Sequence, residues 1–374
     1  MCVRRAGDVV TEPLVPVRGP LAPDERRRAS RHLLLDGFGP AAQERLAGAR
    51  VLVVGAGGLG SAVLPYLAAA GVGVLGVLDD DVVDASNLQR QVLHGTADVG
   101  RAKTASAADA LRALRPALEV VEHRERLDAG NARRLLAGYD VVVDGSDTFA
   151  TRYAVSDAAA ALGLPVVWGT VLGWDGQVAV WWSAAPGGRG ITYPDVFGPQ
   201  PPEGESCDTV GVLGPACGVV GATMAVEAVK LLTGTGDVAL GRLLVYDART
   251  SAWDTIDLAE IEPREVEPAE GEPSEVVRAD GEPAPDDPVH PGDLSGVGQE
   301  LVLDVGVRPA GVPGAVHLRL EDLAAGVLPA ELLAHPADAP VVVVCEMGLR
   351  SRGAAALLAA EGWSHVTSRA LREA

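Results

Sequence analysis

Short apolar runs alternate with helical patterns along most of this chain. Each apolar run has the length of a buried strand, and each helical pattern repeats its apolar positions every three or four residues. Strand and helix in alternation are typical of an α/β protein with a parallel sheet. The pattern predicts strands at residues 51–54, 74–78, 118–123, 140–146, 165–170, 176–182 and 242–247, and helices at 61–70, 103–114, 131–136, 151–162 and 215–232.

The first predicted strand ends in the sequence GAGGLG, where a helix begins. Glycines permit a tight turn there, and the free amides of a helix N-terminus attract an anion. Asp79 ends the next strand about twenty residues on, where a nucleotide-binding unit places an acid against a ribose. The alternative is a turn that only packs a helix on a strand. The glycines of this predicted phosphate-binding turn are Gly55, Gly57, Gly58 and Gly60.

The length of 374 residues exceeds one ordinary hydrophobic core, so we expect two domains. Residues 260–293 hold twelve acidic residues against two arginines, with seven prolines, which predicts an extended, self-repelling linker. Residues 1–28 are proline-rich and basic without periodicity, which is typical of a flexible arm. The predicted divisions are an arm at 1–28, a first domain at 29–259, a linker at 260–298 and a short second domain at 299–374.

Net charge and cysteine content narrow the range of possible binding partners and of possible cellular compartments. A net charge of −20 argues against nucleic acid and anionic membranes. Residues 51–78 are uncharged and long enough to span a bilayer, but their glycines and Pro65 break a helix, so we interpret them as core. The four cysteines form no C-x-x-C pair, and the N-terminus has no apolar signal region, which together favour the cytoplasm.

Five motifs in order are shared with one enzyme family. They are GAGGLG, Asp79, SNLQRQ at 86–91, Lys103, and DGSDT at 144–148 followed by Arg152. From about residue 31 to 258 the chain resembles the MoeB/ThiF adenylyltransferases, relatives of ubiquitin-activating enzymes. The resemblance implies a Rossmann-like, doubly wound, mainly parallel sheet with an antiparallel extension. It also implies a homodimer that uses ATP and Mg²⁺ to adenylate the C-terminal glycine of a small ubiquitin-like sulfur carrier ending in Gly-Gly.

The resemblance assigns roles to individual residues. Joining two anions requires cations for the phosphates and an acid for the metal more than a protein nucleophile. Taken alone, Arg90 and Lys103 fit solvated surface charges, and Asp147 fits an N-cap of the following helix. The family pattern places Gly58 against the nucleotide and Asp79 on the ribose. It places Asp147 on Mg²⁺ with Thr148 adjacent, and Arg31 across a dimer interface in the partner's site. The residues that it places around the phosphates are Ser86, Asn87, Gln89 and Arg90, with Lys103 beside them.

The chain departs from the family at its zinc site. Family members commonly hold a structural zinc on two C-x-x-C pairs, whereas Arg189 and Thr192 occupy the first pair's places and residues 261–271 hold no cysteine. We therefore expect no zinc, and we predict that residues 186–206 form a loop. Cys207 matches a cysteine of the family's crossover loop, proposed to form thioester or disulfide links to the carrier, although some relatives function without it. Cys217 fits the core.

The last domain resembles a small α/β rhodanese. CEMGLRS at 345–351 follows a buried strand and matches the family's Cys-x-x-Gly-x-Arg-Ser loop. Backbone amides, Arg350 and a helix dipole would stabilise a persulfide on Cys345, loaded by a sulfur donor such as a cysteine desulfurase. The alternative is a buried structural cysteine. Three departures weaken the match. The segment at 305–313 is short, Glu346 follows the cysteine, and Ser368 and Arg369 stand in place of the customary Gly-Gly.

Two other classes of function stay open at this stage. An NAD-binding oxidoreductase shares the glycine turn and Asp79 but leaves Arg90, Lys103 and Asp147 without a role. A non-catalytic partner or scaffold fits the missing zinc ligands and the altered rhodanese loop. The sequence names neither the carrier nor the pathway, with molybdopterin and thiamine biosynthesis both candidates.

Overall fold

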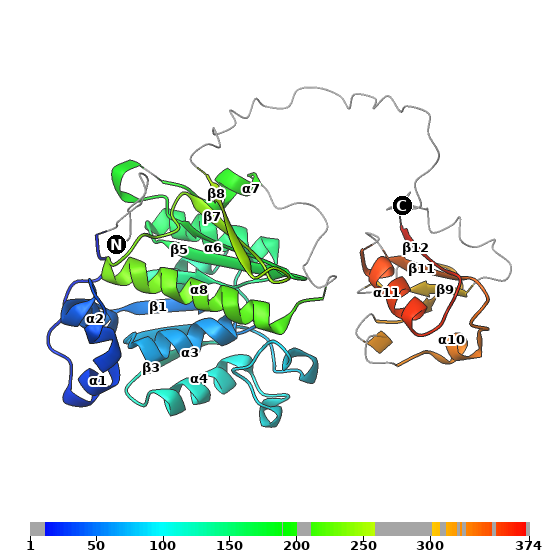
Figure 1. Cartoon of the computed structure of the whole chain (residues 1–374), viewed down its shortest axis with the longest axis horizontal. Helices are drawn as coiled ribbons and strands as arrows, with labels where there is room; N and C mark the ends of the chain where they lie inside the picture. The colour runs from blue at the N-terminus through cyan, green and yellow to red at the C-terminus, as the bar shows by residue number, and fades with distance from the viewer. Residues whose placement is uncertain are drawn as a thin grey trace, which may run out of the picture. The chain divides into compact units, whose positions relative to one another are not determined.

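The computed structural model describes residues 12–188, 190–199, 211–258, 301–306, 312–319, 322–323, 327–345 and 349–371. These residues fall into two units, each with its own sheet (Figure 1). The predicted linker at 260–298, Cys207 and Arg189 lie outside the described residues, as does the side chain of Arg350.

The first unit is built on an eight-stranded sheet in the order β3-β2-β1-β4-β5-β6-β7-β8. The five strands from β3 to β5 are parallel, and β6, β7 and β8 continue the sheet in antiparallel pairing. This confirms the predicted doubly wound sheet with an antiparallel extension. The strands are β1 Arg50–Val54, β2 Val74–Leu78, β3 Glu119–His123, β4 Val141–Asp144, β5 Val166–Leu172, β6 Asp175–Trp181, β7 Arg242–Asp247 and β8 Ala252–Asp257.

Helices cover both faces of this sheet (Figure 1). Val51 and Val53 of β1 pack toward α3 and α8, while Leu52 and Val54 pack toward α5 and α6, as expected for a strand buried on both faces. Helix α8 is long and apolar enough to cross a membrane, but most of it is buried here against the sheet and α3. The helices are α2 Gly39–Gly48, α3 Gly60–Ala70, α4 Lys103–Leu114, α5 Ala132–Leu136, α6 Phe149–Leu162, α7 Tyr193–Phe197 and α8 Gly214–Thr233.

The N-terminal segment is attached to the first unit, which corrects the prediction of a flexible arm for its described part. Val15 is 1% exposed in the main core, and the backbone N–H of Leu14 donates to Leu231 O. Helix α1 (Pro23–Arg28) follows, with Pro23 in its first turn, where proline is tolerated. The ion pair from Glu25 to the buried Arg115 then joins α1 to the end of α4.

Two short elements escaped the sequence pattern. All six residues of β8 are exposed, so it shows no apolar alternation, and its pairing with β7 alone makes it a strand. Helix α7 lies inside the predicted loop at 186–206. Thr192 begins it with a capping box, because Asp195 Oδ2 accepts hydrogen bonds from the Thr192 N–H and hydroxyl at 2.7 and 2.6 Å.

Aromatic packing holds α7 where relatives are expected to use zinc. Thr192 stands at the place of an expected zinc cysteine, and the next residue, Tyr193, is 2% exposed. Its ring lies 4.5 to 6.0 Å from four other aromatic rings, a range in which aromatic pairs attract. The loop is thus fixed by a hydrophobic cluster. The other members of this aromatic cluster are Tyr153, Trp168, Trp181 and Phe197.

The second unit is a small parallel sheet in the order β10-β9-β11-β12. Val341 and Val343 of β11 pack with Leu358 of α11 on one face of the sheet, and Val342 packs on the other. This unit has the predicted α/β character. Its elements are β9 Leu301–Asp304, β10 Val316–His317, α10 Ala330–Ala334, β11 Val341–Cys345, α11 Leu349–Ala360 and β12 Val366–Ala370.

Replacing the central tyrosine of the aromatic cluster tests its structural role. We expect Tyr193→Ala to lower the free energy of unfolding of the first unit by about 3–5 kcal/mol, the cost of deleting a large buried aromatic ring. Urea unfolding followed by tryptophan fluorescence measures this, because Trp168 and Trp181 lie in the cluster.

Tyr66, which is 60% exposed on α3, provides the matched control. Tyr66→Ala should change the same free energy by less than about 0.5 kcal/mol. We also expect a chelator to leave the unfolding midpoint of the wild-type protein unchanged. A chelator-sensitive midpoint would mean that a metal, and not the aromatic cluster, holds this loop.

Candidate functional site

The carboxyl ends of β1, β2 and β4 meet at one edge of the large sheet. The Gly145 N–H donates to Val54 O at 3.0 Å, and the Gly55 N–H donates to Leu78 O at 2.8 Å. A Cβ on Gly55 would lie 3.2 Å from Gly145 O and would need a positive φ that favours glycine. The glycine turn after β1 and the loop after β4 are therefore in direct contact. This is the crevice where open α/β sheets bind ligands.

Two helix N-termini converge on this turn. Helix α3 starts at Gly60, where a Cβ would overlap the carbonyl oxygen of Gly55. Near the start of α8, Cys217 places its Sγ only 2.9 Å from where a Cβ of Gly58 would lie. Arg90 packs against the same position, with its Cγ 3.6 Å away. The N-terminal ends of helices attract anions, and an arginine beside them adds to that attraction.

Asp79 supports the turn from the end of β2. Its Oδ2 accepts the Ala56 N–H at 2.8 Å, and its Oδ1 accepts the Asp81 N–H at 2.9 Å. Burial raises the pKa of the Asp79 carboxyl, while the nearby Lys103 and these two hydrogen bonds lower it. Each oxygen keeps a further lone pair, which suits a carboxylate that also receives ribose hydroxyls.

Lys103 is a buried cation at the start of α4. Its side chain is 7% exposed, and its Nζ lies 2.9 Å from Oδ2 of Asp81, whose side chain is largely in solvent. A lysine this buried requires a partner, and Asp81 supplies one. The interpretation of Lys103 as a solvated surface charge is therefore wrong.

The polar segment after β2 wraps around the turn. The short helix η2 (Ala85–Asn87) is capped by Asp84, which accepts the Ser86 N–H and hydroxyl at 2.8 and 2.6 Å. The Arg90 guanidinium donates to Ser86 O at 3.4 Å, which draws the arginine back toward η2. The carbonyl oxygen of Gln89 packs against Gly214 at the start of α8. The predicted phosphate-binding residues thus form one continuous segment beside the turn.

Two acids at the end of β4 and in the loop after it differ in environment. Asp144 is 1% exposed and accepts the Ser146 N–H at 3.0 Å; burial raises the pKa of its carboxyl and the nearby Arg152 lowers it. Asp147 is exposed. The N-cap of α6 is Thr148, whose Oγ1 accepts the Thr151 N–H at 3.3 Å, so the interpretation of Asp147 as the cap is wrong. Asp147 therefore holds no place in the helix cap.

These side chains are suited to a magnesium ion that arrives with phosphates. In the part of the chain that the structure describes, no three histidine, cysteine or acidic side chains gather as a metal-binding group. Mg²⁺ in nucleotide sites is commonly held by one or two carboxylates together with phosphate oxygens and water. Asp147 is exposed in the loop after β4, and Gly145 and Ser146 of that loop contact the glycine turn.

The sequence of most of the first unit matches one protein family. The model of the ThiF family matches residues 29–266. The chain belongs to the ThiF family. A relative from Thermus thermophilus, named sulfur carrier protein adenylyltransferase, is 49% identical over 228 residues, which cover 60% of this chain and 84% of the relative.

The name of a second relative of this ThiF protein states two activities. The probable adenylyltransferase/sulfurtransferase MoeZ of Mycobacterium tuberculosis is 51% identical over 248 residues, which cover 66% of this chain. The match spans 63% of the length of MoeZ. The crystal structure of E. coli MccB with ATP shares the fold, with a TM-score of 0.54 at 21% identity over 62% of this chain and 71% of that one.

The structure of the ThiF protein brings together most of the predicted site. The four glycines, Asp79, Arg90 and Lys103 gather at the carboxyl ends of β1 and β2, and Asp147 lies in the loop after β4, which contacts the turn. Arg31 is exposed on η1 (Ala29–Leu34) and makes no hydrogen bond or ion pair with the turn among the described residues. Cys217 is buried in the core, as predicted, and burial raises the pKa of its thiol.

Sequence reasoning missed three residues of the site. Asp81 holds Lys103, and the buried His94 contacts Ala56 of the turn. Gln91 is 3% exposed, lies near Gly57, and keeps a buried Oε1 without a hydrogen-bond partner in the structure. Gln91 is the last residue of the SNLQRQ motif and His94 follows it by three residues, but only the tertiary contacts separate them from their exposed neighbours Val92 and Gly95.

Cys345 ends β11 in the second unit and is 3% exposed. The Ser351 N–H donates to its Sγ at 3.3 Å, and the Ser351 hydroxyl lies 3.6 Å from the same sulfur. This is the strand–sulfur–helix order that the rhodanese resemblance predicts. An amide that donates to the sulfur stabilises a thiolate.

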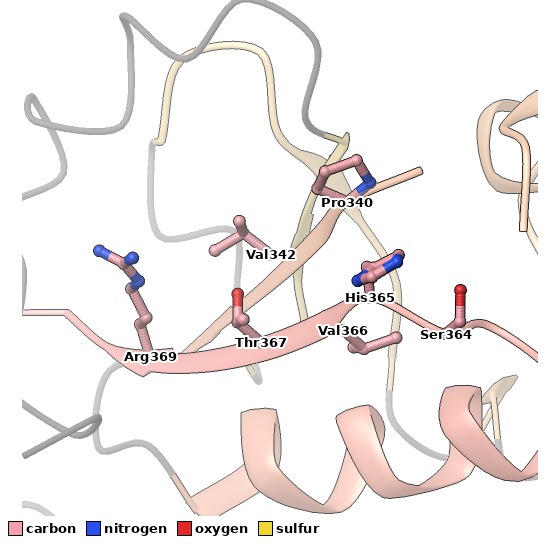
Figure 2. A pocket seen from close by; sticks show the side chains of 7 residues that line it. All are labelled: Pro340, Val342, Ser364, His365, Val366, Thr367 and Arg369. Atoms are coloured by element: carbon pink, nitrogen blue, oxygen red, sulfur yellow. The ribbon is translucent and has the colours of Figure 1, made fainter. Parts of the chain in front are cut away.

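A cavity of about 380 Å³ opens elsewhere in the second unit. Figure 2 shows Arg369 and Thr367 of β12 and His365 just before it on one face, and Val366 directed to the other face, toward a helix. The cavity begins at Pro340 and includes Val342, near the start of β11, whereas Cys345 ends that strand. It therefore does not include the predicted sulfur-carrying cysteine.

The close contact between Gly58 and Cys217 generates a stability prediction. A methyl group at Gly58 would lie 2.9 Å from the Cys217 Sγ, so we expect Gly58→Ala to cost about 1–3 kcal/mol of unfolding free energy through overpacking. Cys217→Ala removes the obstacle. In a double-mutant cycle, the loss of unfolding free energy in the double variant should therefore be smaller than the sum of the losses in the two single variants by at least about 0.5 kcal/mol.

Gly57→Ala is the matched control, because its nearest atom, Gln91 Nε2, would be 3.7 Å from the new methyl group. This substitution should change the unfolding free energy by less than about 0.5 kcal/mol. Strict additivity of Gly58→Ala and Cys217→Ala would contradict the packing described here.

Proposed function

We propose that this chain adenylates the C-terminal glycine of a small ubiquitin-like sulfur carrier protein ending in Gly-Gly, with ATP as co-substrate. The observation that carries the proposal is the meeting of the glycine turn with Arg90, Lys103 and the Asp147 loop at one sheet edge. The names of the two relatives, one a sulfur carrier protein adenylyltransferase, support the same substrate class.

The reaction joins two anions. A carboxylate oxygen of the carrier's last glycine attacks the α-phosphorus of ATP, a new O–P bond forms, and the bond to the bridging oxygen breaks with release of pyrophosphate. Arg90 and Lys103 would offset the repulsion between the carboxylate and the phosphates, and Asp79 would orient the ribose. The N-termini of α3 and α8 add fixed positive potential to the same place.

Asp147 would hold the magnesium ion of ATP–Mg²⁺, with Thr148 adjacent. When bound, the ion neutralises charge on the phosphates and on the departing pyrophosphate. Thr148 is engaged with Thr151 in the helix cap, so the carboxylate of Asp147 is the group that remains for the ion.

Cys345 would supply the sulfur. A sulfur donor such as a cysteine desulfurase would transfer a sulfur atom to the Cys345 thiolate, and the resulting persulfide would attack the carrier's acyl adenylate, forming a C–S bond and releasing AMP. Attack by a second thiol on the Cys345 sulfur of this acyl disulfide would then break the S–S bond and free the carrier thiocarboxylate. The hydrogen bond from the Ser351 N–H to Sγ supports this role. Cys207, outside the described residues, would provide the alternative covalent link to the carrier.

We further propose that the enzyme acts as a homodimer in the cytoplasm. Arg31 is exposed on η1, and the apolar side chains of Leu34 and Leu35 next to it are 77% and 55% exposed. A second copy that covers these leucines would bring its Arg31 to this copy's phosphates. A monomer in analytical ultracentrifugation at micromolar concentration would contradict this arrangement.

ATP–pyrophosphate exchange tests the proposed reaction directly. Wild-type protein should support exchange only when mixed with the cognate Gly-Gly-ending protein among the ubiquitin-like proteins of its source organism. We expect Asp147→Ala to abolish exchange, and Arg90→Ala and Lys103→Ala each to lower its rate on the order of 10²-fold or more, because each removes a charge that faces the phosphates.

Arg112→Ala is the control for Lys103→Ala, since Arg112 lies on the same helix, is exposed and pairs with Glu122. It should leave exchange unchanged. Cys345→Ala should keep full exchange and lose only sulfur transfer to the carrier. Binding of ATP–Mg²⁺ without exchange for any carrier would favour a non-catalytic partner, and tight nicotinamide binding would favour an oxidoreductase.

The ionisation of Asp79 predicts a pH dependence of nucleoside binding. Because burial raises the pKa of this carboxyl, it takes up a proton at a higher pH than a free aspartate and then loses its charge and part of its acceptor capacity. We expect the affinity for adenosine, which carries no titrating phosphate, to fall as the pH is lowered through the raised pKa of this carboxyl.

Asp79→Asn is the comparison for this titration, because its amide has no charge to lose. The ratio of wild-type to Asp79→Asn affinity, measured by calorimetry, should decrease toward acid pH. A constant ratio would show that Asp79 does not bind the ribose as an ionised group.

A further inference from the structure

His94 is a buried residue that the reaction scheme above leaves without a role. Its ring is 5% exposed, and both ring nitrogens have partners: Nε2 lies 3.0 Å from Ala56 O, and Nδ1 lies 2.8 Å from the Ser106 hydroxyl. Ala56 belongs to the glycine turn, and Ser106 belongs to α4. The histidine therefore bridges the turn and the helix that carries Lys103.

The chemistry of these partners fixes the proton on the ring. A carbonyl oxygen can only accept, so Nε2 carries the hydrogen and donates it to Ala56 O. Nδ1 lies 2.8 Å from the Ser106 hydroxyl, which also hydrogen-bonds to Asp98. A second hydrogen bond of this kind sets the tautomer and the orientation of an imidazole.

Holding Ala56 O also sets the direction of the next amide. In a planar trans peptide the C=O of Ala56 and the N–H of Gly57 point in opposite directions. When His94 holds the oxygen on the buried side, the Gly57 N–H is aimed away from the core. No hydrogen bond within the described residues takes up that N–H. An outward amide in a glycine turn is a ready donor for an anion.

The turn is held at Ala56 from both sides. Asp79 accepts the Ala56 N–H, and His94 donates to the Ala56 carbonyl. Both supports rest on α4, because Lys103 lies beside Asp79 and Ser106 follows Lys103 by three residues, on the same face of the helix. The first turns of α4 thus brace the turn on its two sides.

We propose that His94 is a positioning residue for the phosphates of the nucleotide, which it serves by aiming the Gly57 N–H through its hydrogen bond to Ala56 O. This inference rests on the proposed function, since it takes the bound anion to be the phosphates of ATP. Adenosine has no phosphate and does not depend on that amide.

Three substitutions of His94 separate this role from simple packing. His94→Phe keeps a planar ring without a donor. His94→Gln places an amide nitrogen near the Nε2 position, where it can donate to Ala56 O, and His94→Asn places its amide nitrogen near Nδ1, toward Ser106. Calorimetry with ATP–Mg²⁺ and with adenosine is the measurement, and thermal unfolding reports whether each variant is folded.

We expect His94→Phe to weaken ATP–Mg²⁺ binding about tenfold, a fold-change typical of one lost hydrogen bond to a phosphate-directed group, and to leave adenosine binding unchanged. His94→Gln should recover ATP affinity to within about threefold of the wild type, whereas His94→Asn should stay as weak as His94→Phe.

Equal loss of ATP and adenosine affinity in folded His94→Phe would overturn the inference, and so would recovery by His94→Asn as complete as that by His94→Gln. If His94→Phe does not fold, the comparison of the Gln and Asn variants decides alone. Wild-type protein that binds no ATP–Mg²⁺ would instead remove the proposed function, and the inference with it. Wild-type binding without any effect of the His94 variants removes only the inference.

Discussion

Close backbone approach at the carboxyl ends of β1 and β4 is the constraint on which the rest of the site depends. The loop after β4 touches the turn after β1 at Gly55 and Gly145, and Gly60 starts α3 against the Gly55 carbonyl. Side chains at these positions would separate the two loops. Their absence allows acids and cations from four different segments to lie along one crevice, a general property of the switch point of a doubly wound sheet.

Burial in this crevice makes an unpaired charge costly in free energy, so the charged side chains there need defined partners. Asp79 and Asp144 both have a raised pKa because they are withdrawn from water, and Lys103 and Arg152 respectively lower it again. Each acid also accepts a backbone N–H of the loop that it supports. The charges therefore act first on the backbone and only then on a ligand. These hydrogen bonds attach the glycine-rich turn and the loop after β4 to the acids at the strand ends.

The aromatic cluster around Tyr193 holds α7 in place through side-chain packing. Thr192, at the place of an expected zinc ligand, starts α7 through its capping box with Asp195. The ring of Tyr193 then packs against Trp168 and Trp181 under the sheet. Hydrophobic burial and a hydrogen-bonded cap together fix this segment without calling on any group outside the described residues.

The sequence by itself determined the strand–helix alternation, the glycine turn with Asp79, and the cations Arg90 and Lys103, because those signals are periodic or lie within one motif. Only the tertiary structure decided that Thr148 caps α6, that Asp81 holds Lys103 and that His94 bonds to Ala56. It also revealed β8, which is exposed and exists through its pairing with β7. The physical reason is the same in each case: these roles depend on a partner from another segment, and a pattern along one chain does not contain the distance between two segments.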